Sequence, residues 1–324
     1  MVMARTTEAR PNNNSARGGL TVAWVTLGLA VVFVAAVLIG AKVLVDRHIY
    51  APVAMGTVDA PGSSSPQCDS IVGDLPGKVG DYRKVDVAAP APQGTGAYRN
   101  HDRDELTVRC GVSTPSQYTA LSDTEERGGT TWLRVRDTTK GSDLSTWYAV
   151  GQSPVVAVTA SGDLDGADLD DLGGLISSHG DTTSAPEPRP APLTDLRAAP
   201  GADAAACDAF TAALPGRIGD ASRVTDRPGL PAGTVAYTAP GLEPVVVRCG
   251  VAAPSSYHPG VQLQQVDDVP WFAESSLDQG STEARYFAVG YSPLVALSMP
   301  ADAGNDAITQ ISRAVAGALH RTRN

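Results

Sequence analysis

The chain has 324 residues, of which 42% are hydrophobic and only 5% aromatic, and its 25 basic and 35 acidic side chains give a formal net charge of −10. This acidic balance argues against a protein that grips nucleic acid, because neutralising phosphates requires clustered Lys and Arg. The length suits two domains of about 100 to 150 residues behind an N-terminal segment.

The N-terminal segment contains an almost wholly apolar run at residues 19–45, in which the first charge after Arg17 is Lys42. A helix needs about 20 apolar residues to cross a bilayer, whereas a cleavable signal peptide has an apolar region of roughly 7 to 15. The run therefore predicts an uncleaved, single-pass transmembrane helix. The alternative is a signal peptide cut near Ala41, which would export the same residues.

The charges around this run predict its orientation in the cell membrane. Residues 1–18, with three arginines against the single Glu8, are expected to form a cytoplasmic tail by the positive-inside rule. The rest of the chain is then extracytoplasmic. Without the five basic and two acidic residues up to Arg47, 20 basic and 33 acidic residues remain, so the exported part has a formal charge of −13.

The exported part contains one domain twice. A gapless shift of 139 residues places Cys68 on Cys207 and matches the segments 75–77 and 108–112 with identical segments. This period far exceeds the roughly 20 to 50 residues of solenoid and propeller repeats, so each copy must close its own core.

We predict repeat domains at residues 68–179 and 204–324. Residues 46–67 are expected to be a linker, and residues 180–203 a second, proline-rich linker that is stiff and extended and holds the domains apart.

Each copy shows the same predicted order of elements. A short helix begins at the first cysteine, several strands follow without helices between them, and an amphipathic helix closes the copy. The predicted helices are at 68–75, 169–176, 207–214 and 308–315, and the predicted strands are at 83–87, 106–112, 131–135, 147–150, 155–159, 245–251 and 294–298. This order predicts an α+β fold in which the helices cover one face of a mainly antiparallel sheet.

The four cysteines predict two disulfides. Cys68 and Cys110 are 42 residues apart, as are Cys207 and Cys249. Four cysteines permit three connectivities, and the repeat favours pairing inside each copy in an oxidising compartment. A metal site is the weaker interpretation, because there is no Cys-x-x-Cys and no histidine occurs in both copies. We expect neither a metal nor a cofactor.

Two serines lie in a partial nucleophile motif. Ser153 and Ser292 each follow Gly-x but are followed by proline, and no shared histidine could act as a base. We therefore predict no catalytic residue and interpret the motif as a turn or bulge between strands. The alternative is an enzyme with an unrepeated site, for which His101, Asp102 and Asp104 form the best cluster.

Five aspartates in the first copy could suggest a calcium loop: Asp163, Asp165, Asp168, Asp170 and Asp171. The glycine spacing does not fit an EF-hand, and only Asp302 corresponds in the second copy. Acidic residues at the start of a helix are better explained as caps.

The remaining candidates are repeated side chains that could bind a ligand. Arg109 and Arg248 precede the second cysteine of each copy in a strand that otherwise alternates apolar residues. Each is expected to be solvated or paired across the sheet, or else to clamp a carboxylate or phosphate. Repeated aromatic residues are expected to anchor the core or, alternatively, to form a platform for a carbohydrate or peptide. The candidates for binding are Tyr98, Tyr237, Trp132 and Trp271, and Tyr118 and Tyr257 are repeated in the same way.

The pattern Cys…Leu-Pro…Arg-Cys-Gly-Val-x-x-Pro…Trp, together with the N-terminal anchor, resembles a domain family of unknown function in secreted or membrane-anchored actinobacterial envelope proteins. The match covers both copies and implies the compartment without implying an activity. The residues that carry it are Cys68, Leu75, Pro76, Arg109, Cys110, Gly111, Val112, Pro115 and Trp132, with Cys207, Leu214, Pro215, Arg248, Cys249, Gly250, Val251, Pro254 and Trp271.

We expect a membrane-anchored, non-enzymatic binding or scaffolding module whose partner is an envelope protein, a peptide or a cell-wall component. Repetition without a shared nucleophile, base or metal set favours binding, because two linked weak sites gain avidity. An envelope enzyme and a purely structural or assembly protein are the alternatives.

Overall fold

The computed structural model describes residues 14–224, 227, 229–258, 260–275 and 283–322. The chain divides into two compact units, Met1–Ala51 and Pro52–Asn324, which we describe separately. Most of the tail predicted at residues 1–18 therefore lies outside the described residues.

The first unit contains the helix α1 (Asn14–Ile49). Its stretch Trp24–Ile49 has a mean hydropathy of 2.6 in its most apolar window, and Trp24 and Phe33 are 67% and 69% exposed. Within the described residues this helix alone is long and apolar enough to cross a membrane, although a signal sequence would have the same properties. The predicted run at residues 19–45 is thus helical.

The second unit contains two eight-stranded antiparallel sheets. The first sheet has the order β1-β2-β3-β4-β8-β7-β6-β5. Its strands are β1 (Lys78–Val79), β2 (Tyr82–Val85), β3 (Thr95–Arg99), β4 (Glu105–Cys110), β5 (Thr124–Arg127), β6 (Thr130–Arg136), β7 (Leu144–Ala149) and β8 (Val156–Ser161).

The second sheet repeats this order as β9-β10-β11-β12-β17-β15-β14-β13. Its strands are β9 (Arg217–Ile218), β10 (Ala221–Val224), β11 (Thr234–Thr238), β12 (Val245–Cys249), β13 (Gln264–Val266), β14 (Val269–Ser275), β15 (Ala284–Ala288) and β17 (Val295–Met299), and a separate pair joins β16 (Tyr291–Ser292) to β18 (His320–Arg321). The predicted α+β class with two like antiparallel sheets is confirmed.

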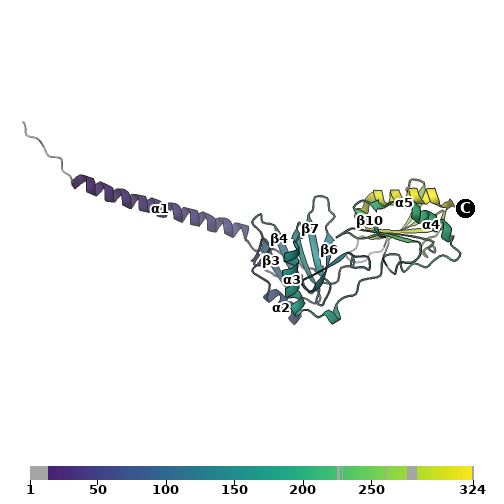
Figure 1. Cartoon of the computed structure of the whole chain (residues 1–324), viewed down its shortest axis with the longest axis horizontal. Helices are drawn as coiled ribbons and strands as arrows, with labels where there is room; N and C mark the ends of the chain where they lie inside the picture. The colour runs from purple at the N-terminus through teal and green to yellow at the C-terminus, as the bar shows by residue number, and fades with distance from the viewer. Residues whose placement is uncertain (1–13, 225–226, 228, 259, 276–282, 323–324) are drawn as a thin grey trace, which may run out of the picture. The chain divides into compact units, whose positions relative to one another are not determined.

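Helices cover one face of each sheet. The first copy has α2 (Pro66–Gly73) and α3 (Gly166–His179), and the second has α4 (Ala204–Ala213) and α5 (Gly304–Ala318); short 3₁₀ turns occur at Thr182–Ser184 and Ala301–Ala303. Figure 1 shows α3 across one face of the first sheet and α4 beside α5 over the second. The buried residues Ile71, Leu172 and Ile176 of the first pair pack with Leu106 and Val108 of β4.

The helices α2, α3 and α4 begin at side-chain caps. The Asp165 carboxylate accepts a hydrogen bond from the backbone N–H of Asp168, and Ser65 and Asp203 cap α2 and α4 in the same way. The capping interpretation is confirmed for Asp165. Asp163, which corresponds to Asp302, does not cap α3 but pairs with Arg134. The side chain of Asp302 lies outside the described residues, and α5 follows Ala303 without a side-chain cap.

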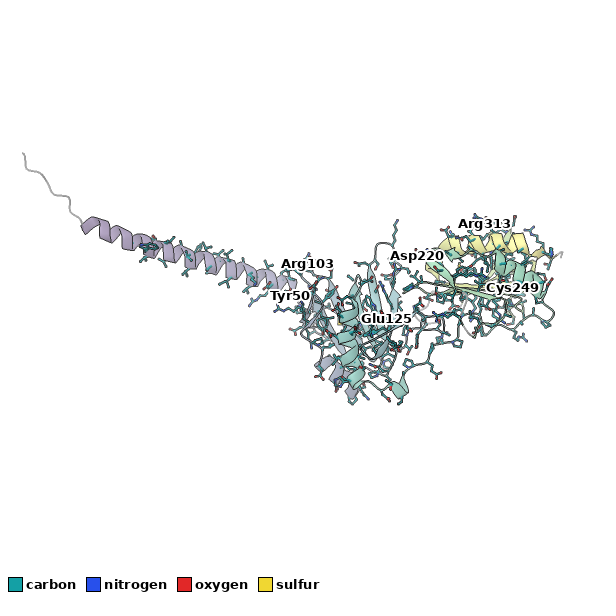
Figure 2. All side chains as sticks on the ribbon, in the orientation of Figure 1. Tyr50, Arg103, Glu125, Asp220, Cys249 and Arg313 are labelled. Carbon is teal, nitrogen blue, oxygen red and sulfur yellow. A yellow bond between two sulfur atoms is a disulfide. The ribbon has the colours of Figure 1, made fainter. Side chains whose placement is uncertain are left out.

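Each copy contains one disulfide, Cys68–Cys110 and Cys207–Cys249, as the repeat predicted. Each bond joins the first helix of a copy to a central strand, β4 or β12. Figure 2 labels Cys249 on the second of these strands. Among the described residues there is no free cysteine.

The segments that we interpreted as spacers pack against the domains. The first strap, residues 53–62, begins where the Val53 backbone N–H donates to Asp86 O (3.0 Å) and ends where Gly62 N–H donates to Gly111 O (3.0 Å). The second strap, residues 189–199, ends in the same way with Ala199 N–H donating to Gly250 O (2.8 Å). These segments are therefore part of the folded unit. The domain boundaries at residues 68 and 204 stay predictions.

The straps lie on the sheet face opposite the helices. Val53 and Met55 are buried against Ala97, whose neighbour Tyr98 points to the helices, and successive side chains of a strand alternate between faces. In the second copy Leu193 is fully buried in a cluster with Ala236 and Val246. Both faces of each sheet are thus covered at least in part.

Removing the first disulfide should destabilise the first copy. The change Cys68→Ser with Cys110→Ser opens a loop of 42 residues and should lower the free energy of unfolding by about 2–5 kcal/mol. Denaturant unfolding of the full chain measures this, with Cys207→Ser and Cys249→Ser as the matched pair. Non-reducing peptide mapping that joined Cys68 to Cys207 or Cys249 would contradict the pairing.

Candidate functional site

The two tyrosine candidates lie in the core. Tyr98 and Tyr237 have no exposed surface, and their hydroxyls donate to the carbonyl oxygens of Pro76 (2.9 Å) and Pro215 (2.8 Å). Burial raises the pKa of Tyr98 above its usual range, and it raises that of Tyr237 to about 12 against a small opposing effect of the Arg223 charge. Each tyrosine joins its sheet to the Leu-Pro-Gly turn that ends the first helix.

The two tryptophan candidates are buried as well. Trp132 is 1% exposed and donates from Nε1 to Arg127 O (3.3 Å), whereas Trp271 is fully buried and donates to the Ser312 hydroxyl (2.9 Å) on α5. Neither the tryptophans nor the tyrosines present a ring to a ligand. The structure therefore supports the packing interpretation over the surface platform, and these four residues do not enter the site.

Arg248 is held by the second strap. It is 7% exposed, and its Nη1 donates to the carbonyl oxygens of Leu193 (2.8 Å) and Leu196 (2.7 Å). Leu193 has φ +64°, an uncommon conformation for a leucine. Such a conformation costs about 1–3 kcal/mol and persists only where the surrounding structure holds it. Arg248 stabilises this turn of the strap, so its position in the strand is explained by structure.

A carboxylate also acts on Arg248. Asp195 of the same strap lies between Leu193 and Leu196 and makes a two-pronged ion pair with Arg285 (2.7 and 3.1 Å). Burial lowers the pKa of Arg248, and the negative charge of Asp195 raises it in part. The charge of Arg248 is thus compensated inside the chain.

Arg109, the counterpart of Arg248, is in a different situation. It is partly buried and lines a hollow of about 230 Å³ together with Thr57, Ser63, Gln93 and Thr95. Among the residues that the structure describes, its side chain makes no hydrogen bond or ion pair. Burial lowers its pKa, and no neighbouring charge contributes to that shift. This arginine is a cation with free donors at a recess of the surface.

The residues of the alternative enzyme site lie at the surface of the first domain. His101, Asp102 and Asp104 are exposed in the turn between β3 and β4, where the Asp104 carboxylate accepts from Asn100 Nδ2 (2.9 Å). Figure 2 shows Arg103, which belongs to the same turn, at the periphery of the first domain. Within the described parts of the chain, no three His, Cys, Asp or Glu side chains gather to hold a metal ion.

One unusual residue, Gln152, lies beside the partial serine motif and was not identified from the sequence. Gln152 is fully buried, and neither its Oε1 nor its Nε2 has a hydrogen-bond partner among the described residues. In the second copy this place is taken by Tyr291, which donates to Asp268 O (3.1 Å) and accepts from Arg321 Nε (3.1 Å). Sequence reasoning had no signal for Gln152, because its burial depends on packing against Gly180.

These features define a class of protein: one apolar helix followed by two α+β domains of the same topology, each with its own disulfide. The family model described as "Protein of unknown function (DUF3515)" matches residues 27–185 and, a second time, residues 180–323. The chain therefore belongs to this family and contains its domain in two tandem copies. No curated protein and no solved structure matches the chain.

The two arginines should respond differently to truncation. Arg248→Ala leaves one buried and one partly buried carbonyl oxygen without this donor, so we expect it to lower the free energy of unfolding by about 1–3 kcal/mol and to speed hydrogen exchange in residues 189–199. Arg109→Ala removes no such bond and should cost about 0.5 kcal/mol or less. Urea unfolding of both variants tests this, and equal costs would show that Arg109 also has a structural role.

Stability should fall in alkaline solution because of the buried tyrosines. The folded-state pKa of Tyr237 is about 12, so the unfolded chain loses this proton first, near the ordinary value of about 10. Its contribution is full below about pH 10 and is lost as the pH rises through about 12. The free energy of unfolding, measured against pH, should fall less steeply in Tyr237→Phe, and an equal fall would be inconsistent with this role.

Proposed function

We propose that this protein is a membrane-anchored, extracytoplasmic binding protein, and that its first domain binds the ligand. The observation that carries the proposal is the free, partly buried Arg109 beside a hollow. In this proposal the protein belongs to the cell envelope of an actinobacterium, as the family resemblance of the sequence implies. It is not an enzyme.

Two independent features support the proposed anchor and compartment. α1 is long and apolar enough to cross a membrane, and the chain beyond it contains two disulfides. Disulfides persist in oxidising compartments outside the cytoplasm. An N-terminus in the cytoplasm, with both domains outside, satisfies both observations and the distribution of arginines.

The difference between the two arginines supports the proposal that the first domain binds the ligand. A charge that is partly removed from water costs free energy unless it is paired, and Arg248 Nη1 donates to two carbonyl oxygens of the strap. Arg109 stands at the same strand position without a partner among the described residues. Groups that stay unsatisfied where a homologous group is satisfied are typical of sites that await a ligand.

The second domain then has a different role. Its arginine clamps the strap that connects the two copies, so its sheet face is closed by residues of the chain itself. We propose that it supports the first domain, and that the two copies are not equivalent binding sites.

A membrane-impermeant crosslinker applied to intact cells tests the proposal. Wild type and Lys78→Ala, which removes one 67%-exposed cation from the first domain, should capture the same partner. Arg109→Ala should capture at least about tenfold less, the change expected when about 1.4 kcal/mol of binding free energy is lost.

Three outcomes would contradict the proposal. Failure of the reagent to modify the protein at all would contradict the external orientation. Equal capture by Arg109→Ala would remove Arg109 from the site, and equal loss in Lys78→Ala would show only a general effect of charge.

A further inference from the structure

The two straps can be compared residue by residue. Ser113 N–H donates to Asp59 O (3.3 Å), and its counterpart Ala252 donates in the same way to Arg197 O (2.8 Å). Asp59 and Arg197 therefore occupy the same place. The burial pattern supports this register, because Met55 and Leu193, each four residues earlier, both point into the sheet.

In this register Asp195 of the second strap corresponds to Thr57 of the first. The second strap brings a carboxylate and two carbonyl oxygens to Arg248. The first strap has a neutral hydroxyl at that position and gives Arg109 no acceptor within the described residues. Leu193 adopts a left-handed backbone conformation, and its carbonyl oxygen accepts from Arg248. Met55 does not adopt this conformation.

We infer that the hollow beside Arg109 binds a carboxylate group of the ligand, in the place that the acceptors of the second strap occupy beside Arg248. This inference rests on the proposed function and names the chemistry of its ligand. A guanidinium holds a carboxylate through two parallel N–H···O bonds, and partial burial strengthens that pair. The recess of about 230 Å³ is large enough for the group and its first carbon atoms.

The charge of the lining favours a carboxylate over a phosphate. Arg109 is the one cation among the residues that line this hollow, and none of them is acidic. One guanidinium balances the single charge of a carboxylate, whereas phosphate sites usually combine several cations or a helix N-terminus. The carboxylate could belong to the end of a peptide or to a small organic acid, and the experiment separates these sources.

The experiment measures how fast an arginine-selective dicarbonyl reagent modifies Arg109 in the detergent-solubilised full chain, by peptide mass spectrometry. The probes are acetate, N-acetyl-Ala-Ala with a free C-terminal carboxylate, the same peptide as its amide, and inorganic phosphate. At a probe concentration about four times its Kd, modification of Arg109 should slow about fivefold. Arg248 is 7% exposed and serves as the unreactive internal reference.

A variant that supplies the carboxylate from the chain itself sharpens the test. Thr57→Asp places an acid where the second strap has Asp195, so it should slow modification of Arg109 without any probe and abolish protection by the probes. Thr57→Asn, neutral and of the same size as Asp, is the matched control and should behave as wild type.

The outcomes separate the ligand class from the proposed function. Protection by the free peptide at lower concentration than acetate supports a peptide end, and equal protection by both supports a small acid. Equal protection by the amide, stronger protection by phosphate, or no effect of Thr57→Asp would overturn the carboxylate. If one of these results were obtained and Arg109→Ala still failed to capture the crosslinked partner, the proposed binding function would stand, with a ligand that does not bind through a carboxylate.

Discussion

Each sheet of this protein has two apolar faces, and other segments of the chain must shield each face from water. Two helices supply one cover in each copy, and a strap from the preceding chain supplies the other. This requirement explains the Arg-Cys-Gly segment: the cysteine joins the strand to the helix on one face, and the arginine points to the other face. Gly111, at φ +75°, lets the strap approach so closely that a Cβ atom would lie 2.2 Å from the Gly62 carbonyl carbon.

Much of this architecture could be predicted because it depends on local or repeated patterns. The gapless match places both cysteine pairs, and the absence of helices between the predicted strands predicts the antiparallel sheets. The cap at Asp165 follows from local backbone chemistry. Burial of Val53 and Leu193 could not be predicted, because proline-rich sequence is typical of extended chain whether or not it packs on a sheet.

The candidate site was predictable only in part, for a related reason. The repeat singles out Arg109 and Arg248 as equals, since their strands match without a gap. What distinguishes them lies upstream of the first cysteine, where the straps correspond at offsets one or two residues shorter than that of the strands. The difference between Thr57 and Asp195 is therefore visible only when the backbone contacts align the straps. Tyr98 and Trp132 drew attention through repetition, which core packing produces as readily as binding does.

The straps also bear on where the ancestral gene was duplicated. A segment cut at residue 204 would hold the helices and strands of the second copy but would lack Ala191 and Leu193, which are buried against its sheet. Because both copies possess a strap, the ancestral reading frame must have included it, upstream of the first cysteine. The repeated module thus begins in what looks like connecting sequence, upstream of the first cysteine.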